Sequence, residues 1–244
     1  NGKRCDAVKA FLNPIIHNDK LKIFLKTIAL KIIIENKKAI GVEILHKGKL
    51  EKVYANNEVI LTAGSLISPK LLMLSGIGNE EELKKFDIKI IEKLNGVGKN
   101  LQDHHEVPFI SKAKAGFGYH KENKGWRMIK NGIQYLLFNS GPVRSVGVEC
   151  CSFLNPENIL DHRDPKIKLY YVPAMYTDRD TKGLKEDHGV TLTSCIMNPQ
   201  SRGEVTLQSS NPLDRPLINP NFLSHQNDRE IFINSIKLSR EIIN

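Results

Sequence analysis

The 244-residue sequence predicts a mixed fold, α/β in its first part and α+β in its second. Short β-branched blocks follow one another closely through residues 21–54. A nearly continuous apolar run at 58–63 then leads through small residues into a helix, and strand-like and helical segments are more loosely spaced after residue 106. The apolar run is typical of a strand buried on both faces, as in α/β folds. The blocks separated by short turns are typical of antiparallel hairpins.

The β-branched blocks predict an antiparallel meander. Strands are expected at 31–34, 40–45 and 50–54, with turns at 36–38 and 47–49. Turns this short allow neighbouring strands to pair only in opposite directions.

The next segment predicts a buried strand, a tight turn and a capped helix. The strand is expected at 58–63 and is broken by Gly64 and Ser65. Ser68 and Pro69 suit the N-cap and first position of a helix that ends at Ser75-Gly76. A turn of small residues lets a ligand approach the backbone, and the start of a helix favours an anionic or electron-rich group.

The remaining elements are expected from shorter patterns. They comprise two further helices, four strands and a final amphipathic helix. In order, the ranges are a helix at 80–86, a strand at 88–91, a helix at 125–138, strands at 166–172, 190–197 and 204–208, and a helix from Asn227 onward.

Composition excludes several classes of function. The net charge of +9 could indicate nucleic acid or an anionic membrane, but the lysines are scattered singly and form no dense basic run, so we expect no nucleic-acid partner. No apolar run reaches the length of a membrane span. The four cysteines and eight histidines show no metal-ligand spacing, and no metal site is expected.

The segment Gly64–Gly78 resembles the second signature of the glucose–methanol–choline oxidoreductase family. Further blocks resemble the same family in the same order, and together they cover essentially the whole chain. These blocks are Asn1–Arg4, Gly96–His104, Gly141–Pro142 with Gly147–Glu149, and Pro199–Val205. The block of Gly141–Pro142 followed by Gly147–Glu149 is similar to the substrate-domain motif of the insect glucose dehydrogenase branch.

The resemblance implies a two-domain flavoprotein. Residues 1–105 would form the C-terminal part of an FAD/NAD(P)-binding domain, 106–196 an antiparallel-sheet substrate-binding domain, and 197–244 the start of the family's C-terminal region. The glycine-rich phosphate loop and the catalytic histidine of the family have no counterpart here, so the chain resembles the middle piece of a longer protein. An extracellular location is expected from the insect branch alone.

The resemblance also implies FAD as the cofactor and suggests which residues contact it. These candidates are Ala29, Thr62, Ala63, Gly64, Ser65, Asn100 and His104. The residues alone allow simpler interpretations: a tight turn at Gly64, an ordinary apolar strand position at Ala29, and a loop held by local side-chain hydrogen bonds around Asn100.

No catalytic residue is assigned within the chain. Asp103 and His104 could form a carboxylate–histidine pair acting as a base, but the resembling segment of the family does not carry the catalytic base. Glu149 could face a substrate or could equally be a solvated glutamate.

The expected function is therefore that of a piece of an FAD-dependent oxidoreductase. Its substrate would be the CH–OH group of a small-molecule alcohol or sugar, and its electron acceptor a quinone or oxygen. Two alternatives stay open: a catalytically inactive remnant that serves as a binding or structural module, and a flavoprotein of another alcohol-oxidising branch. Without a phosphate cradle, we expect the chain alone not to hold FAD stoichiometrically.

Overall fold

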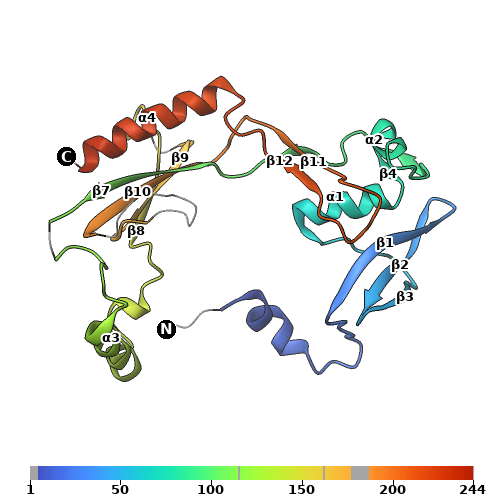
Figure 1. The fold of residues 1–244 in the computed structure, drawn as a ribbon, viewed down its shortest axis with the longest axis horizontal. Helices are drawn as coiled ribbons and strands as arrows, with labels where there is room; N and C mark the ends of the chain where they lie inside the picture. The colour runs from blue at the N-terminus through green and yellow to red at the C-terminus, as the bar shows by residue number, and fades with distance from the viewer. Residues whose placement is uncertain (1–4, 115, 162, 177–186, 244) are drawn as a thin grey trace. The chain divides into compact units, whose positions relative to one another are not determined.

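The computed structural model describes residues 5–114, 116–161, 163–176 and 187–243, which form two compact units (Figure 1). One unit consists of residues 5–102 and 202–222, and the other consists of 103–201 and 223–243. The first four residues, and with them the resemblance at Asn1–Arg4, lie outside the described residues. Helical turns at Val8–Leu12 and Asn13–Ile15 open the first unit.

The predicted antiparallel meander is confirmed. It is a three-stranded sheet in the order β1-β2-β3, and both of its pairings are antiparallel. A register shift interrupts the pairing of β1 with β2 between Ala29 and Lys31. The strands are β1 (Thr27–Glu35), β2 (Lys38–His46) and β3 (Lys49–Tyr54).

The predicted start of the next helix is wrong by one turn. Helix α1 (Gly64–Leu74) begins at Gly64, and Pro69 lies inside it, so Ser68 is not the N-cap. Gly64 adopts a φ of +84°, which a glycine tolerates at little cost and which turns the extended chain into the helix. The end of the helix is confirmed, with Ser75 as the C-cap and Gly76 at a φ of +86°.

The predicted strand at 58–63 is also wrong for the described chain. The segment forms no ladder with any described strand, and Ile60 is 73% exposed. A strand is defined by hydrogen bonds to its neighbours, and the described residues supply no neighbour here.

Ser75 joins helix α1 to the meander. Its Oγ accepts the N–H of Ile32 at 2.9 Å and donates to the carbonyl of Leu71 at 2.6 Å. Met73 of α1 belongs to a small apolar core. Partly buried Phe86, Ile88, Ile90 and Val97 pack against that core. The other buried members of this core are Leu74, Leu83 and Leu207.

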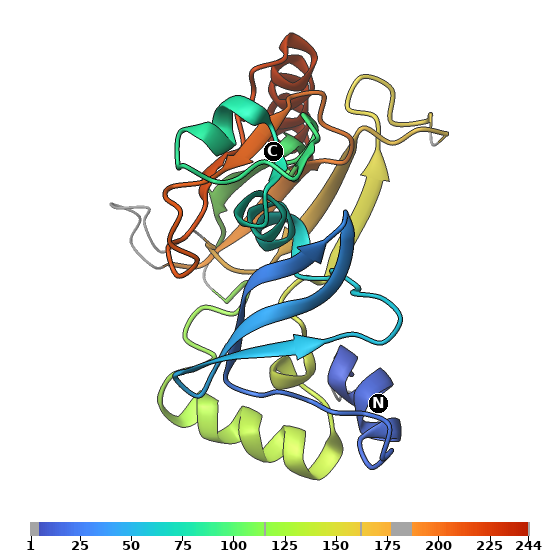
Figure 2. The same ribbon diagram turned by 90° about the vertical axis from the view of Figure 1, so that its right-hand side faces the viewer.

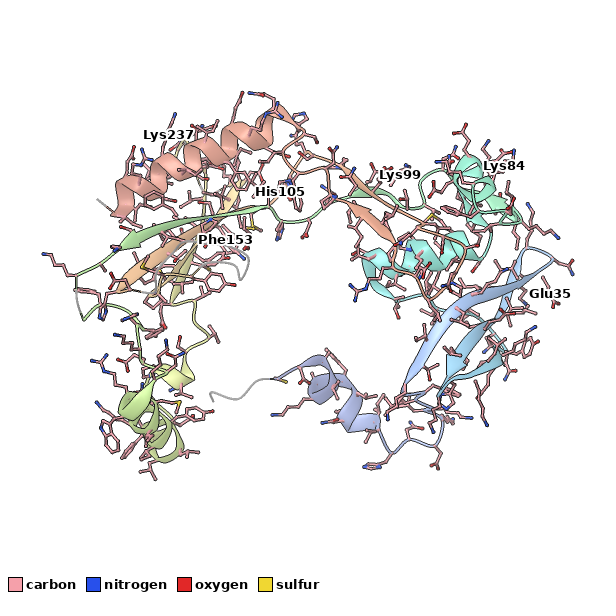
Figure 3. All side chains as sticks on the ribbon, viewed as in Figure 1. Glu35, Lys84, Lys99, His105, Phe153 and Lys237 are labelled. Carbon is pink, nitrogen blue, oxygen red and sulfur yellow. The ribbon has the colours of Figure 1, made fainter. Side chains whose placement is uncertain are left out.

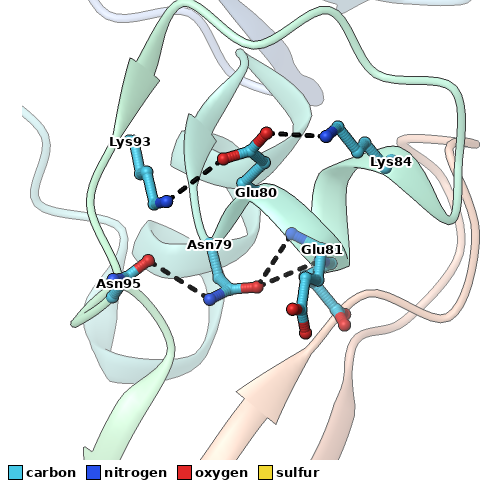
Figure 4. A network of polar contacts seen from close by, with 7 residues as sticks. Asn79, Glu80, Glu81, Lys84, Lys93 and Asn95 are labelled. Carbon is cyan, nitrogen blue, oxygen red and sulfur yellow. Dashed lines mark hydrogen bonds and ion pairs between the residues drawn. The ribbon is translucent and has the colours of Figure 1, made fainter.

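The predicted short charged helix is present as α2 (Glu80–Lys84). The side chain of Asn79 caps it by accepting the N–H groups of Glu81 and Glu82 (Figure 4). Glu80, the first residue of the helix, pairs with Lys84 at its other end and with Lys93 outside it. The strand expected at 88–91 instead falls at β5 (Glu92–Lys93), which pairs in parallel with β4 (Ile77–Gly78).

A third sheet in this unit joins distant parts of the sequence. Its order is β12-β11-β6, and both pairings are antiparallel. Strand β6 lies near residue 100, whereas the other two strands follow residue 202. The strands are β6 (Lys99–Leu101), β11 (Gly203–Thr206) and β12 (Leu217–Asn219).

The other unit is built on a four-stranded antiparallel sheet in the order β7-β10-β9-β8. Helix α4 (Gln226–Ile243) covers one face of this sheet and keeps Lys237 on its exposed side (Figures 1 and 3). Ile231 and Phe232 of α4 lie in the same apolar core as Ile167 and Ile196. The strands are β7 (Glu106–Lys112), β8 (Cys150–Leu154), β9 (Ile167–Val172) and β10 (Gly189–Ile196).

The predicted helix at 125–138 is confirmed as α3 (Gly125–Phe138). Asn139 ends it in a left-handed conformation, and a short 3₁₀ turn at Pro142–Arg144 follows.

Buried Asp228, in the first turn of α4, holds the chain that enters this helix. Its carboxylate accepts the backbone N–H groups of Gln200 and Ser201 and the hydroxyl of Ser201, at distances of 2.6–3.1 Å. Burial by itself raises the pKa of Asp228, but these hydrogen bonds outweigh it and hold the pKa below its usual value.

We expect Asp228→Ala to lower the free energy of unfolding by about 3 kcal/mol, because three buried donors lose their acceptor. Since the folded pKa lies below the unfolded one, the contribution of Asp228 is present above the usual value of 3.8 and is lost as pH falls further. Urea unfolding at several pH values should therefore show the difference between the two proteins shrinking in acid. Exposed Asp164→Ala is the control, and an equal loss there would contradict the assignment.

Lys70 is a buried lysine whose amine holds the 209–215 loop against α1. Its Nζ donates to the carbonyls of Pro212 and Asp214, at 2.6 and 2.5 Å. Burial lowers the pKa of Lys70, and the Asp214 carboxylate partly opposes this.

We expect Lys70→Met to cost about 2 kcal/mol of unfolding free energy, because the two carbonyls lose their donor. Lys84→Met, which breaks an exposed ion pair, should cost less than about 0.5 kcal/mol in the same measurement.

Candidate functional site

The start of helix α1 presents backbone amides that no side chain caps. Ala63 occupies the N-cap position, and its methyl group cannot accept a hydrogen bond. The space that a Cβ on Gly64 would occupy is open. Uncapped amides at a helix start carry partial positive charge, so this end of α1 can receive a polar or anionic group.

A pocket of about 360 Å³ opens beside this helix start. It lies wholly within the unit of residues 5–102 and 202–222, and it brings two of the predicted site residues, Ser65 and Asn100, to one place. The full lining is Ser65, Pro69, Gly98, Lys99, Asn100, Leu101, Gln102 and Val205.

Strand β6 also lines this pocket, and one of its residues has a positive φ. Asn100 has a φ of +59°, a left-handed conformation that asparagine adopts more readily than most residues. Lys99 next to it forms an ion pair with Glu204 of the neighbouring strand β11. The pocket is thus lined by an amide side chain and by fixed backbone, which suits a ligand with several hydrogen-bonding groups.

Gly98 sets how closely β11 approaches this wall. The Val205 N–H donates to the Gly98 carbonyl at 2.7 Å. A Cβ on Gly98 would lie 2.2 Å from the Val205 carbonyl oxygen, and its φ is +78°. Any side chain here would push β11 away from the pocket.

Thr62 and Ala63 directly precede the helix start, and both are exposed. They stand beside Gly64 and Ser65, although they are not among the pocket-lining residues. Ala29 is exposed on β1, at the register shift, and is likewise not part of the pocket lining. The structure therefore brings Ser65 and Asn100 together and leaves Ala29 apart from them.

His104 lies in the other unit and is exposed. The Asp103 carboxylate accepts the backbone N–H of His104 at 2.8 Å, so this contact is a local loop bond. The next residue, His105, is the buried one, and its Nδ1 lies 2.8 Å from the Asp103 carbonyl oxygen (Figure 3). Sequence reasoning missed His105, because two adjacent histidines give no sign of which one is buried.

A second pocket, of about 430 Å³, lies within the unit that contains β7–β10. Tyr119 on its wall donates its hydroxyl hydrogen to the carboxylate of Glu149, and Ser145 donates to the same oxygen at 2.5 Å. The bonds from Ser145 and Tyr119 lower the pKa of Glu149, so this exposed carboxylate stays ionised. The lining residues are Tyr119, His120, Lys121, Glu122, Asn123, Asn131, Pro142, Val143, Ala174, Met175 and Asp187.

The described residues contain neither a metal-binding cluster nor a membrane-spanning helix. Across the described ranges, no cluster of three or more His, Cys, Asp or Glu side chains is arranged to hold a metal ion. Among the helices of those same ranges, none combines the length and the apolar character needed to cross a membrane.

Solved structures share this fold. A variant formate oxidase from Aspergillus oryzae RIB40, studied for modification of its FAD, superposes with a TM-score of 0.79 at 29% identity, covering 88% of this chain and 42% of the other. Pyridoxine 4-oxidase from Mesorbium loti superposes with a TM-score of 0.82 over 98% of this chain and 43% of the other. Its 24% identity supports the fold alone.

Curated relatives match along nearly the whole chain. The mitochondrial choline dehydrogenase of Mus musculus is 34% identical over 241 residues, which is 99% of this chain and 40% of that protein. The oxygen-dependent choline dehydrogenase of Brucella anthropi is 35% identical over 242 residues, 99% of this chain and 43% of the relative. The chain thus spans about two-fifths of the length of these relatives.

Family models match both ends of the chain. The N-terminal model of the GMC oxidoreductases matches residues 1–106, and their C-terminal model matches residues 199–244. FAD is the cofactor of these oxidoreductases, and the uncapped start of α1 beside the pocket lined by Ser65 and Asn100 fits it. The chain therefore belongs to the GMC oxidoreductase family, as the signature at Gly64–Gly78 predicts.

Proposed function

We propose that this chain is part of an FAD-dependent oxidoreductase that acts on the CH–OH group of a small-molecule alcohol. The observation that carries the proposal is the pocket that joins Ser65, at the uncapped start of α1, to Asn100 on β6. Membership of the GMC oxidoreductases supports it. The reaction would pass electrons to oxygen or a quinone. The extracellular location stays a prediction.

In this proposal the chain's residues bind and orient. The bound cofactor would supply the acceptor for the hydride that leaves the alcohol carbon. The amides of the first turn of α1 would face a polar or anionic part of the cofactor, and the Asn100 amide would hydrogen-bond it across the pocket. The contact proposed for Ala29 would use its backbone at the register shift of β1. No residue of the chain is assigned as the proton acceptor.

We propose a cationic alcohol as the substrate class. Relatives along the whole chain are named choline dehydrogenases, and choline is an alcohol that carries a quaternary ammonium group. Glu149 offers an exposed, ionised carboxylate held by Tyr119 and Ser145, and a carboxylate beside an aromatic ring suits such a cation. A glucose-like sugar, the expectation from the insect branch, carries no charge for Glu149 to recognise.

We expect Ser65→Trp to reduce the FAD content of the whole protein severalfold, because the indole would fill the pocket beside the start of α1. The measurement is the flavin absorbance per mole of purified protein, with thermal unfolding as a check on folding. Ile67→Trp is the matched control, since Ile67 lies on the same helix, is exposed, and does not line the pocket. Full flavin content in Ser65→Trp would contradict the proposed site, and protein that never carries flavin would support the inactive remnant.

We expect Glu149→Gln to raise the KM for choline by about tenfold or more, because an ionic contact is replaced by a neutral one. The KM for an uncharged alcohol of similar size should change little. Glu157→Gln, which removes a carboxylate paired with Lys166 in the same unit, is the control. Equal effects of Glu149→Gln on charged and uncharged alcohols would count against recognition of a cation.

A further inference from the structure

Helix α3 carries a row of exposed apolar side chains along one face. Trp126 is 73% exposed and Leu136 is 81% exposed, although both are large hydrophobic residues. The spacing of the row follows the helical repeat, so its members share one side of the helix. The row consists of Trp126, Ile129, Ile133, Leu136 and Leu137.

The opposite side of α3 is polar and contacts the segments that flank the helix. Asn131 is buried there, and its Nδ2 donates to the Glu122 carbonyl at 3.1 Å and to the Glu122 carboxylate at 2.8 Å. Gln134 donates to the Ser140 hydroxyl at 3.3 Å. In two perpendicular views the helix stands apart from the sheet of its unit (Figures 1 and 2). A helix of a soluble protein usually has the reverse arrangement, with its apolar face inward.

Positive charge borders the apolar row. Residues 121–138 contain four basic residues and a single acidic one, Glu122. Glu122 is paired with Arg127 at 3.1 Å, which leaves the local charge positive. Lys121, Lys124 and Lys130 are all exposed. A Trp- and Leu-rich face bordered by lysines is typical of helices that lie in the interface of an anionic membrane.

We propose that α3 docks this protein on the surface of an anionic lipid bilayer, with the Trp126–Leu137 row inserted among the lipids and Lys121, Lys124 and Lys130 at the headgroups. Fourteen residues are too few to span a bilayer, so the contact is peripheral. Two copies meeting through α3 would bury the row but would bring like charges together. A lipid surface satisfies both the apolar row and its positive border.

Trp126 is the single tryptophan of the sequence and therefore reports on this contact directly. We expect the whole chain to float with vesicles of phosphatidylglycerol and phosphatidylcholine, and its tryptophan emission to shift to shorter wavelength. Vesicles of phosphatidylcholine alone should bind much more weakly, and added salt should weaken binding to the anionic vesicles. Equal binding to both vesicle types, or none to either, would overturn the proposal.

Variants test whether vesicle binding depends on α3 or on any exposed apolar side chain. We expect Leu136→Glu to weaken vesicle binding about tenfold or more, and Lys130→Gln about fivefold. Leu160→Glu is the matched control, because Leu160 is 82% exposed in the same unit but lies outside α3. Circular dichroism would establish that each variant is folded. Equal weakening by Leu160→Glu would overturn the proposal.

Two further results would assign the row to another occupant and so overturn the proposal. The first is self-association in solution that Leu136→Glu abolishes, which would mean that a second copy covers α3. The second is tryptophan emission that is already at short wavelength and protected from acrylamide before any vesicle is added, which would mean that polypeptide covers Trp126. None of these measurements depends on flavin or on alcohol oxidation.

Discussion

The close approach of Gly98 and Val205 is the contact on which the proposed cofactor pocket depends. It allows β11 to lie against β6, and this pairing fixes the wall that carries Asn100 across from Ser65. A backbone hydrogen bond of 2.7 Å holds the two strands, and the absence of a Cβ on Gly98 makes room for it. The pocket is therefore a product of two segments that the sequence keeps far apart.

The same arrangement explains why the family is recognised at both ends of the chain. The matched N-terminal and C-terminal segments both contribute strands to the unit of residues 5–102 and 202–222. The intervening sheet, with Glu149 near it, belongs to the other unit. In the proposed function, the cofactor pocket and Glu149 would therefore belong to different units of the chain.

Local patterns predicted the elements that depend on local interactions. The meander, the charged helix at Glu80–Lys84 and helix α3 follow from turns, caps and helical spacing that neighbouring residues supply. The strand expected at 58–63 failed because pairing needs a partner, which no local pattern reveals. Strand β7 was missed because Pro108 argues against a strand, yet β7 lies at the edge of its sheet, where a missing N–H is tolerated.

The candidate site was predictable only in part, for the same physical reason. The signature at Gly64–Gly78 pointed to the start of α1, and the block around Asn100 pointed to β6. That the two line one pocket follows from the pairing of β6 with β11, two strands of the same unit that are separated in the sequence by residues 103–201. The start of α1 was missed for a different reason. Pro69 suits the first position of a helix, but the positive φ of Gly64 lets the helix begin about one turn earlier.

The interrupted course of the first unit has a consequence for how the protein is made. Strand β6 leaves the ribosome long before β11 and β12, and residues 103–201 are synthesised between them. The meander and α1 can form early from local contacts, but the separate sheet of β6, β11 and β12 can form only after residues 103–201 have been synthesised. During that interval the pocket wall is incomplete, so binding of a cofactor there would be a late event in biosynthesis.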